Sequence, residues 1–228
     1  MTGTGKGLRI AVIDSGANLR HPHIVARTRR VVFTPDGHGE DLLGHGTAVM
    51  AAIQERAPEA EYWALKIFSK TLRASTTRLI AALSWAVENN MDIINLSLGT
   101  GNLQARDALQ TLVDRARAKG TLVVSARTRR DRSVLPGALE GVLGVEEDRE
   151  LSRDSYRVGD PEMRVWASGY PRPLPGMALD QNLSGISFAV ANMTGFAARV
   201  CANLHQRSPA AVYAALCADL QLLCRSSS

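Results

Sequence analysis

The chain has 228 residues, enough for one hydrophobic core, and its 45% apolar and 21% charged residues are usual for a globular protein. The net charge of +5 is modest, and the chain lacks both the recognition motifs and the interleaved aromatic residues of nucleic-acid-binding proteins. No apolar run approaches the roughly 18 residues of a membrane span, and residues 1–7 lack the apolar core of a signal peptide. We therefore expect a single domain over residues 1–228, in the cytoplasm, with neither nucleic acid nor membrane as a partner.

The three cysteines, Cys201, Cys217 and Cys224, lie near the end of the chain. Their odd number and their spacing match neither a disulfide framework nor a metal site. We expect reduced thiols, which agrees with the cytoplasmic location.

Apolar runs bounded by turn residues predict strands, and apolar residues at helical spacing predict helices, in alternation along the chain. The predicted strands are residues 8–13, 30–33, 62–68, 93–96, 121–124, 142–145 and 164–167. The predicted helices are residues 47–55, 76–90, 103–118, 188–203 and 209–223. This alternation predicts an α/β fold with a doubly wound, mostly parallel sheet that helices cover on both faces. In such a sheet, functional residues gather at the carboxyl ends of the strands.

Three short segments carry groups that are used in nucleophilic catalysis. Asp14 follows the first predicted strand, His45 stands between two glycines before a helix, and Ser187 precedes an apolar helix. A serine hydroxyl attacks a carbonyl only when a histidine takes its proton, and a buried carboxylate holds that histidine in the required tautomer. Each residue alone is more often a turn or capping residue, so the ordered combination is what indicates a catalytic triad.

The order Asp, His, Ser and the motifs around these residues resemble those of the subtilisin-like serine peptidases. The matching motifs are Asp-Ser-Gly from Asp14, Gly-His-Gly-Thr around His45, Gly-Ile-Ser-Phe-Ala around Ser187, and Asn-Leu-Ser-Leu-Gly from Asn95. The resemblance extends over residues 8–203. It implies a subtilisin-like fold in which Asp14 orients His45, His45 acts as general base and then acid, and Ser187 is the nucleophile.

The resemblance also implies how substrate is held. An extended peptide would add as a strand to a segment of the substrate cleft, formed by Ser97, Leu98 and Gly99. The backbone N–H of Ser187 would donate one hydrogen bond to the oxyanion that forms during the reaction.

One departure from the family concerns the second oxyanion donor. The family places an asparagine after the strand that corresponds to residues 121–124, whereas this chain reads Val-Ser-Ala-Arg-Thr-Arg over residues 124–129. Thr128 occupies the place by position and is our candidate donor, and an arginine guanidinium is the alternative. Loss of one such donor typically lowers turnover by about 10²–10³-fold. The enzyme could tolerate this for a specific substrate, or the domain could bind without cutting; the intact triad favours activity.

Further departures concern packing and metals. The residues around the nucleophile differ from the usual family motif at Ile186, Phe188, Ala191 and Asn192, which bears on specificity and packing. The acidic residues before His45 are interpreted as a solvated turn and not as a calcium site; they are Asp36, Glu40 and Asp41. We expect no metal and no cofactor. Only seven residues precede the first strand, so a folding pro-domain would be encoded elsewhere, trimmed from this chain or unnecessary.

Other motifs carry less weight. The segment from Gly3 to Gly7 precedes a strand and has no Ser or Thr after its lysine, so it is not a phosphate-binding loop. His21 and His23 lack further ligands for a metal. A cluster of arginines falls beside the expected cleft, formed by Arg127, Arg129, Arg130 and Arg132. It is either a solvated loop or an electrostatic clamp for an acidic peptide or partner.

The sequence thus predicts a serine endopeptidase with a peptide or protein substrate, and one specific precursor that it processes is the candidate. The alternative is a weakly active or inactive subtilisin-like domain that binds a peptide or a partner protein. Both alternatives share the fold and the cleft, and they differ in the reactivity of Ser187.

Overall fold

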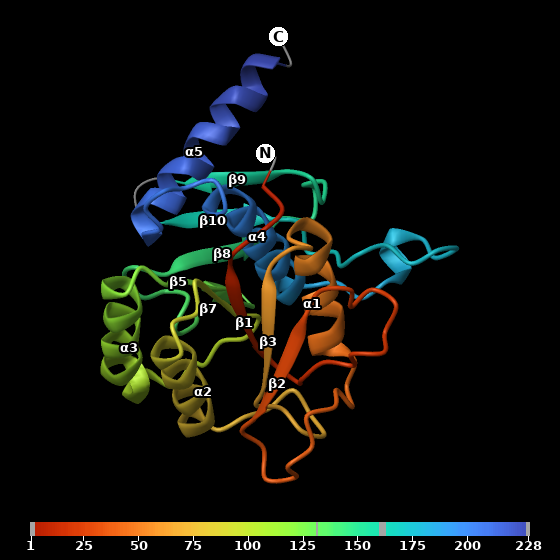
Figure 1. Ribbon diagram of the computed structural model, residues 1–228, viewed down its shortest axis with the longest axis vertical. Helices are drawn as coiled ribbons and strands as arrows, with labels where there is room; N and C mark the ends of the chain where they lie inside the picture. Colours follow the sequence, from red (N-terminus) through yellow and green to blue (C-terminus); the bar gives the residue numbers. More distant parts are fainter. Residues whose placement is uncertain (1–2, 131, 160–162, 227–228) are drawn as a thin grey trace.

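The computed structural model describes residues 3–130, 132–159 and 163–226, apart from the side chains of Asp180 and of residues 221–226. Its main sheet has eight strands in the order β2-β3-β1-β4-β5-β8-β10-β9 (Figure 1). These strands are β1 (Arg9–Asp14), β2 (Thr28–Val32), β3 (Glu61–Lys66), β4 (Ile93–Leu96), β5 (Leu122–Ala126), β8 (Leu143–Glu147), β9 (Tyr156–Gly159) and β10 (Arg164–Ala167). Neighbouring strands are parallel except β9 and β10, so the predicted mostly parallel sheet is confirmed.

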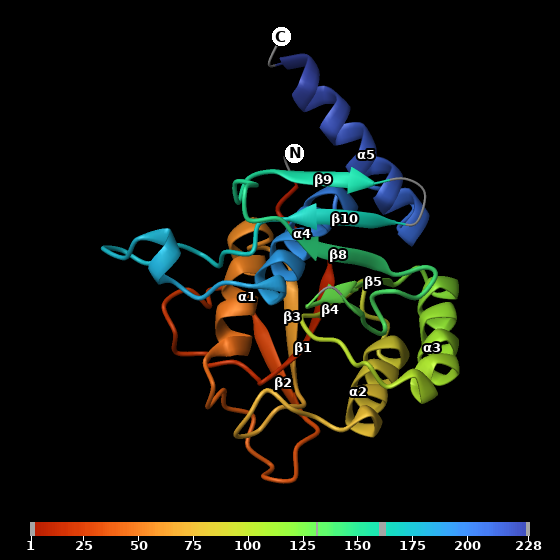
Figure 2. The same ribbon diagram turned by 180° about the vertical axis from the view of Figure 1, so that it is seen from behind.

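Helices cover both faces of the sheet, as the two opposite views show (Figures 1 and 2). The helices are α1 (His45–Arg56), α2 (Thr76–Glu88), α3 (Arg106–Ala118), α4 (Ile186–Cys201) and α5 (Pro209–Ser226), with short 3-10 turns η1 (Leu103–Ala105) and η2 (Leu179–Gln181). Helices α1 and α4 pack on one face with Ile10 and Val12, whereas α2 and α3 pack on the other face with Ala11 and Ile13. Strand β1 is therefore apolar at consecutive positions because both of its sides are buried.

The predicted elements lie within a few residues of the observed ones, and the structure adds two features. The antiparallel strand β9 forms one edge of the sheet, and a two-stranded hairpin follows β5, formed by β6 (Thr128–Arg129) and β7 (Arg132–Ser133). Both are short and polar, so they lack the apolar runs that predict strands. No helix in the described part of the chain is long and apolar enough to cross a membrane.

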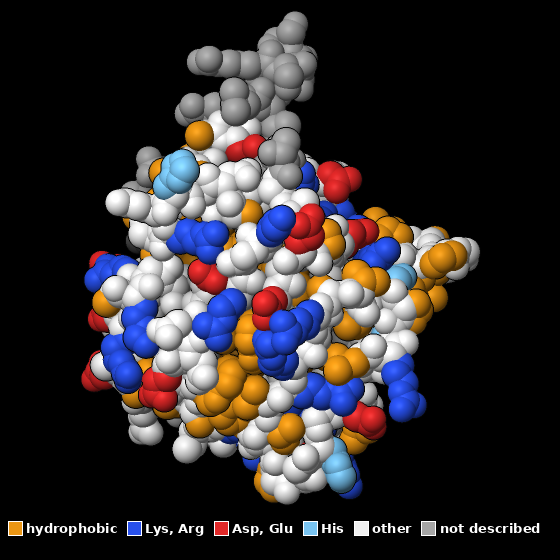
Figure 3. Space-filling view, in the orientation of Figure 1, with side chains coloured by type: hydrophobic (Ala, Val, Ile, Leu, Met, Phe, Trp, Pro, Cys, Tyr) orange, Lys and Arg blue, Asp and Glu red, His pale blue; other side chains and the backbone are white. Residues whose placement is uncertain are grey.

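Basic and acidic side chains are mixed over the face seen in Figure 3. A cluster of arginines at residues 27–30 lies on and beside β2, where Arg29 pairs with Glu61 at 2.8 Å and its guanidinium lies 4.7 Å from the ring centre of Trp63. This cluster is thus part of an ordinary solvated face.

The cysteines lie in the last two helices. Cys201 is buried in α4, and this burial raises the pKa of its thiol to about 11. A thiol with that pKa is protonated near neutrality and is a poor nucleophile. Cys217 is half-buried in α5, and the side chain of Cys224 lies outside the described part.

The order of the sheet determines where functional residues meet. Strands β1, β4 and β5 are neighbours; Asp14 ends β1, and the segments that follow β4 and β5 carry Ser97 and Arg129. Parallel strands present their carboxyl ends at one edge, so these segments converge there.

Candidate active site

The carboxylate of Asp14 and the imidazole of His45 form a direct hydrogen bond. Asp14 ends β1 and is 1% exposed, and its Oδ1 accepts a bond from His45 Nδ1 at 2.7 Å and from the Ser15 amide at 2.7 Å. Its Oδ2 has no hydrogen-bond partner among the described residues. Because Nδ1–H donates to the carboxylate, Nε2 of His45 is left as the acceptor for another proton. The pair therefore has the tautomer that a general base requires.

Two glycines allow this contact. Gly44 precedes α1 in the left-handed conformation, with φ 74°, which favours glycine. A Cβ atom at Gly46 would lie 2.3 Å from the carbonyl oxygen of Gly16, closer than atoms can approach. The first turn of α1 can therefore lie against the end of β1 only with glycine at position 46.

Asp41 binds the backbone at the start of α1 through both of its carboxylate oxygens. Its Oδ1 accepts hydrogen bonds from Ser15 Oγ and from the amides of Leu43 and Gly44. Its Oδ2 accepts bonds from the amide and the hydroxyl of Thr47, at 2.8 and 2.6 Å. The predicted solvated turn is wrong for this residue, because Asp41 is half-buried and caps the helix that carries His45.

Replacement of Asp41 by asparagine is expected to lower the free energy of unfolding by about 1–2 kcal/mol. The remaining amide oxygen can accept the bonds that Oδ1 accepts now, whereas an NH₂ group facing Thr47 cannot. Urea unfolding of Asp41→Asn and of Glu40→Gln, which changes the charge of the exposed neighbour, would measure the difference. Equal stability of both variants would contradict the capping role.

The environment of His45 acts on its pKa in two directions. Burial lowers the pKa, while the hydrogen bond to Asp14 and the negative charges of Asp14 and Asp41 raise it, and the net effect is a raised pKa. The charged imidazolium is thus stabilised, which suits a base that carries a proton during the reaction.

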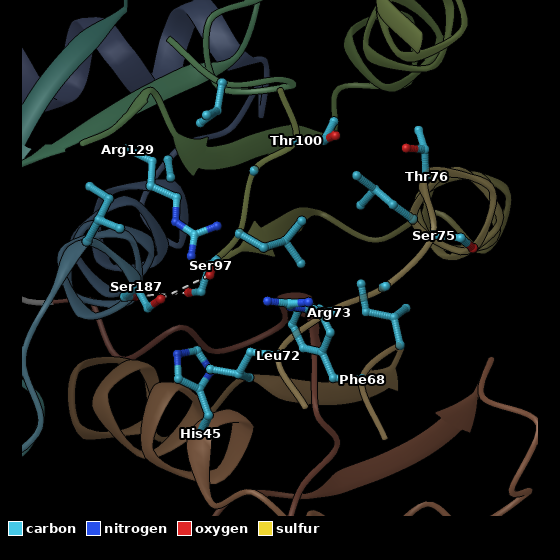
Figure 4. Close-up of a pocket in the computed structure, with 18 residues that line it drawn as sticks. His45, Phe68, Leu72, Arg73, Ser75, Thr76, Ser97, Thr100, Arg129 and Ser187 are labelled. Atoms are coloured by element: carbon cyan, nitrogen blue, oxygen red, sulfur yellow. Dashed lines mark hydrogen bonds between the residues drawn. The ribbon is translucent and has the colours of Figure 1, made fainter. Parts of the chain in front are cut away.

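Ser187 lies in the first turn of α4, after Gly185, whose φ of 138° favours glycine. Figure 4 shows Ser187 and His45 on the same cleft. The Ser187 hydroxyl donates to the carbonyl of Ser97 at 3.0 Å, and no hydrogen bond to His45 is present in the described part. The ring centre of buried Phe188 lies 5.9 Å from that of His45, so the side chain at position 188, where the chain departs from the family motif, packs against His45. Catalytic hydrogen bonds often form only with substrate, and rotation of the Ser187 side chain would redirect its hydroxyl.

A buried polar network supports Ser187, and sequence reasoning missed it. Thr194 Oγ1 donates to Asn95 Oδ1 at 2.9 Å, Asn95 Nδ2 donates to Ser97 Oγ at 3.0 Å, and Ser97 Oγ donates to the Ser187 carbonyl at 2.9 Å. The network thus ties α4 to β4. The available signal was a polar residue inside the buried strand Ile-Ile-Asn-Leu.

The cleft has a volume of about 390 Å³. It is lined by His45, Ile67, Phe68, Leu72, Arg73, Ala74, Ser75, Thr76, Leu79, Ser97, Leu98, Gly99, Thr100, Ala126, Arg129, Val134, Ile186 and Ser187. The structure thus brings two of the three predicted triad residues and all three predicted substrate-binding residues to one cavity, with Asp14 behind His45. The backbone groups of Gly99 make no backbone hydrogen bond within the described residues, so they are free to pair with a peptide.

Thr128, the predicted oxyanion donor, does not line this cleft. It is half-buried in the β6–β7 hairpin, where it pairs with Ser133. The next residue, Arg129, lines the cleft instead. Figure 4 shows its side chain reaching toward Ser97 and Ser187.

The acidic residues near His45 are engaged in other contacts. Asp36 accepts hydrogen bonds from Ser69 and Thr34, which lower its pKa to about 2, and it lies 3.8 Å from the ammonium of buried Lys66. In the described chain, no three His, Cys, Asp or Glu side chains gather so that they could hold a metal ion. The rings of His21 and His23 pack edge to face with centres 5.1 Å apart.

Comparisons with known proteins agree with this architecture. The chain is 30% identical over 216 residues to the thermostable alkaline protease of Halalkalibacterium halodurans, covering 86% of this chain and 57% of that protein. It is 30% identical over 214 residues to subtilisin E of Bacillus subtilis, covering 85% of this chain and 53% of subtilisin E. The chain therefore spans a little more than half the length of these relatives.

Similar folds occur among solved structures. The prenylagaramide maturation protease PagA superposes with a TM-score of 0.71 at 23% identity, over 89% of this chain and 79% of PagA. A cold-adapted subtilisin-like serine proteinase superposes with a TM-score of 0.74 at 21% identity, over 93% of this chain and 82% of its own. The sequence profile described as the subtilase family matches residues 5–219. Since this match covers nearly the whole chain, the protein belongs to the subtilase family.

Proposed function

We propose that the protein is a serine endopeptidase that hydrolyses peptide bonds through an acyl-enzyme on Ser187. The observation that carries this proposal is the 2.7 Å bond between His45 Nδ1 and the buried Asp14 carboxylate, beside a cleft that also contains Ser187. This arrangement is the one that activates a serine hydroxyl.

In the first half of the reaction, Ser187 Oγ attacks the carbonyl carbon of the substrate while His45 Nε2 takes the hydroxyl proton. The C–N bond then breaks, and His45 gives the proton to the leaving amine. In the second half, water attacks the ester while giving a proton to His45, and that proton returns to Ser187 Oγ as the ester bond breaks. Asp14 stays ionised and stabilises the imidazolium in both halves.

The oxyanion formed in each half needs hydrogen-bond donors. The amide of Ser187 lies in the first turn of α4 and has no backbone acceptor among the described residues, so we propose it as one donor. The Thr128 hydroxyl belongs to the hairpin and does not line the cleft, which argues against Thr128 as the second. We propose that the chain works without the usual amide donor and therefore turns over more slowly than its relatives, by about 10²–10³-fold.

We propose a specific peptide or protein precursor as the substrate, because slow turnover is tolerable when few bonds are to be cut. The alternative is a weakly active or inactive domain that holds a peptide or a partner protein in the same cleft. The Ser187 hydroxyl donates its hydrogen bond to the Ser97 carbonyl and not to His45, and this is the observation that favours the alternative.

Labelling with a fluorophosphonate, followed by intact-mass measurement, tests the proposal. The native protein is expected to gain one adduct, because only an assembled triad makes a serine react with this reagent at a useful rate. Heat-denatured protein and Ser187→Ala are expected to gain none.

Ser184→Ala is the matched control, because it removes another hydroxyl of the same loop and should label like the native protein. A native protein that is folded by circular dichroism but gains no adduct would overturn the proposal in favour of a binding domain.

A further inference from the structure

The cleft contains two arginines and no acidic side chain. Arg73 and Arg129 line it, and none of the other lining residues is Asp or Glu. His45 adds positive charge whenever it is protonated. The permanently charged side chains that line the cavity are therefore all positive, while the Asp14 carboxylate lies behind His45.

Neither arginine has a hydrogen-bond or ion-pair partner in the described part of the chain. Arg29, by contrast, pairs with Glu61, and Arg157 pairs with Asp148 at 2.6 Å. Two unpaired guanidinium groups facing one cavity indicate an anionic ligand.

The two arginines reach the cleft from different elements. Arg129 comes from the β6–β7 hairpin and lies beside Ser97 and Ser187, whereas Arg73 comes from the loop between β3 and α2 (Figure 4). A peptide extended along the segment 97–99 would pass near both. Of the other three arginines in the predicted clamp, Arg127 lines a different cavity, and Arg130 and Arg132 do not line the cleft.

We propose that the cleft selects peptides with acidic side chains, with Arg129 binding a carboxylate near the scissile bond and Arg73 binding a second one farther along. The proposal rests on the proposed peptidase function. A guanidinium can bind a carboxylate through two parallel hydrogen bonds. This geometry selects a negatively charged substrate side chain and fixes its orientation. Both arginines are exposed, so added salt should weaken the selection.

This selection fits a slow enzyme. Binding energy from substrate side chains can be used to hold the scissile carbonyl in place against Ser187. Peptides without acidic residues would lose that contribution and be cleaved slowly.

Matched fluorogenic peptides that carry Glu or Gln at each position on either side of the scissile bond test the proposal. We expect kcat/KM to be about 10- to 100-fold higher for the best Glu peptide than for its Gln partner at low salt. Arg129→Gln should reduce the Glu-to-Gln ratio of kcat/KM about tenfold at one peptide position, and Arg73→Gln should do the same at another position. Arg130→Gln is the matched control, because it removes the same charge from the same hairpin outside the cleft and should leave the ratio unchanged.

Fluorophosphonate labelling of the same preparations separates the two proposals. Native protein that labels on Ser187 but cleaves Glu and Gln peptides equally would overturn the acidic preference and leave the peptidase function standing. An equal fall in kcat for all peptides in Arg129→Gln would also overturn it, since that result identifies Arg129 as an oxyanion donor. Native protein that fails to label would instead contradict the peptidase function.

Discussion

Replacement of His45 by alanine is expected to lower kcat by on the order of 10⁶-fold, as known for the corresponding change in subtilisin, and adding Ser187→Ala should lower it little further. The reason is that the hydroxyl and the imidazole act on one proton, so either loss disables the same step. If the two residues acted in separate steps, the fold-losses in kcat of the two single variants would instead multiply in the double variant.

The measurement is a double-mutant cycle on the best acidic peptide, with wild type, both single variants and the double variant compared at one pH. His205→Ala is the matched control, because it removes an exposed histidine outside the cleft and should keep full activity. A double variant with far less activity than either single variant would contradict the shared proton transfer. Thermal unfolding of all four proteins shows whether each is folded.

The alternation of strands and helices along the chain, and the places of Asp14, His45 and Ser187 beside them, could be predicted from the sequence because their signals are local. Each of these residues lies within two positions of a glycine at a strand end or a helix start, and an apolar run fixes the element beside it. The strand β9 could not be predicted, because its four residues alternate weakly and its position at the edge depends on pairing with β10.

The walls of the cleft could be predicted less well, because they depend on which side of a loop each residue faces. Thr128 and Arg129 are neighbours in a hairpin, and side chains alternate along a strand. A shift of one residue therefore decides which of them reaches Ser187. Arg73 comes from a loop with no motif, and only the packing of that loop beside the segment 97–99 brings it into the site.

Replacement of Asp14 by asparagine is expected to lower kcat by about 10⁴-fold, the second-largest effect after loss of the base or nucleophile. The asparagine NH₂ group would donate to His45 Nδ1, so the imidazole proton would move to Nε2. That nitrogen could then no longer take the proton of Ser187. Asp219→Asn is the matched control, because it makes the same change from aspartate to asparagine at a carboxylate on α5, outside the cleft.

The same substitution should change the pH dependence in a defined direction. Asp14 raises the pKa of His45 against the opposing effect of burial, and neutral His45 is the active form, so wild-type activity should rise through a pH above about 6.5. In Asp14→Asn the pKa of His45 falls, and the residual activity should rise at lower pH.

The stability of the protein should change with pH as well. A raised pKa of His45 in the folded protein stabilises the fold at pH values below the pKa of the unfolded chain, and this stabilisation is lost as the pH rises through the pKa of the folded protein. Asp14→Asn should therefore cost more stability at about pH 5 than at about pH 8. Urea unfolding of both proteins at the two pH values, and the pH profiles of kcat/KM, measure these shifts. If the acidic limb of the kcat/KM profile lay at the same pH in both proteins, Asp14 would not set the charge state of His45.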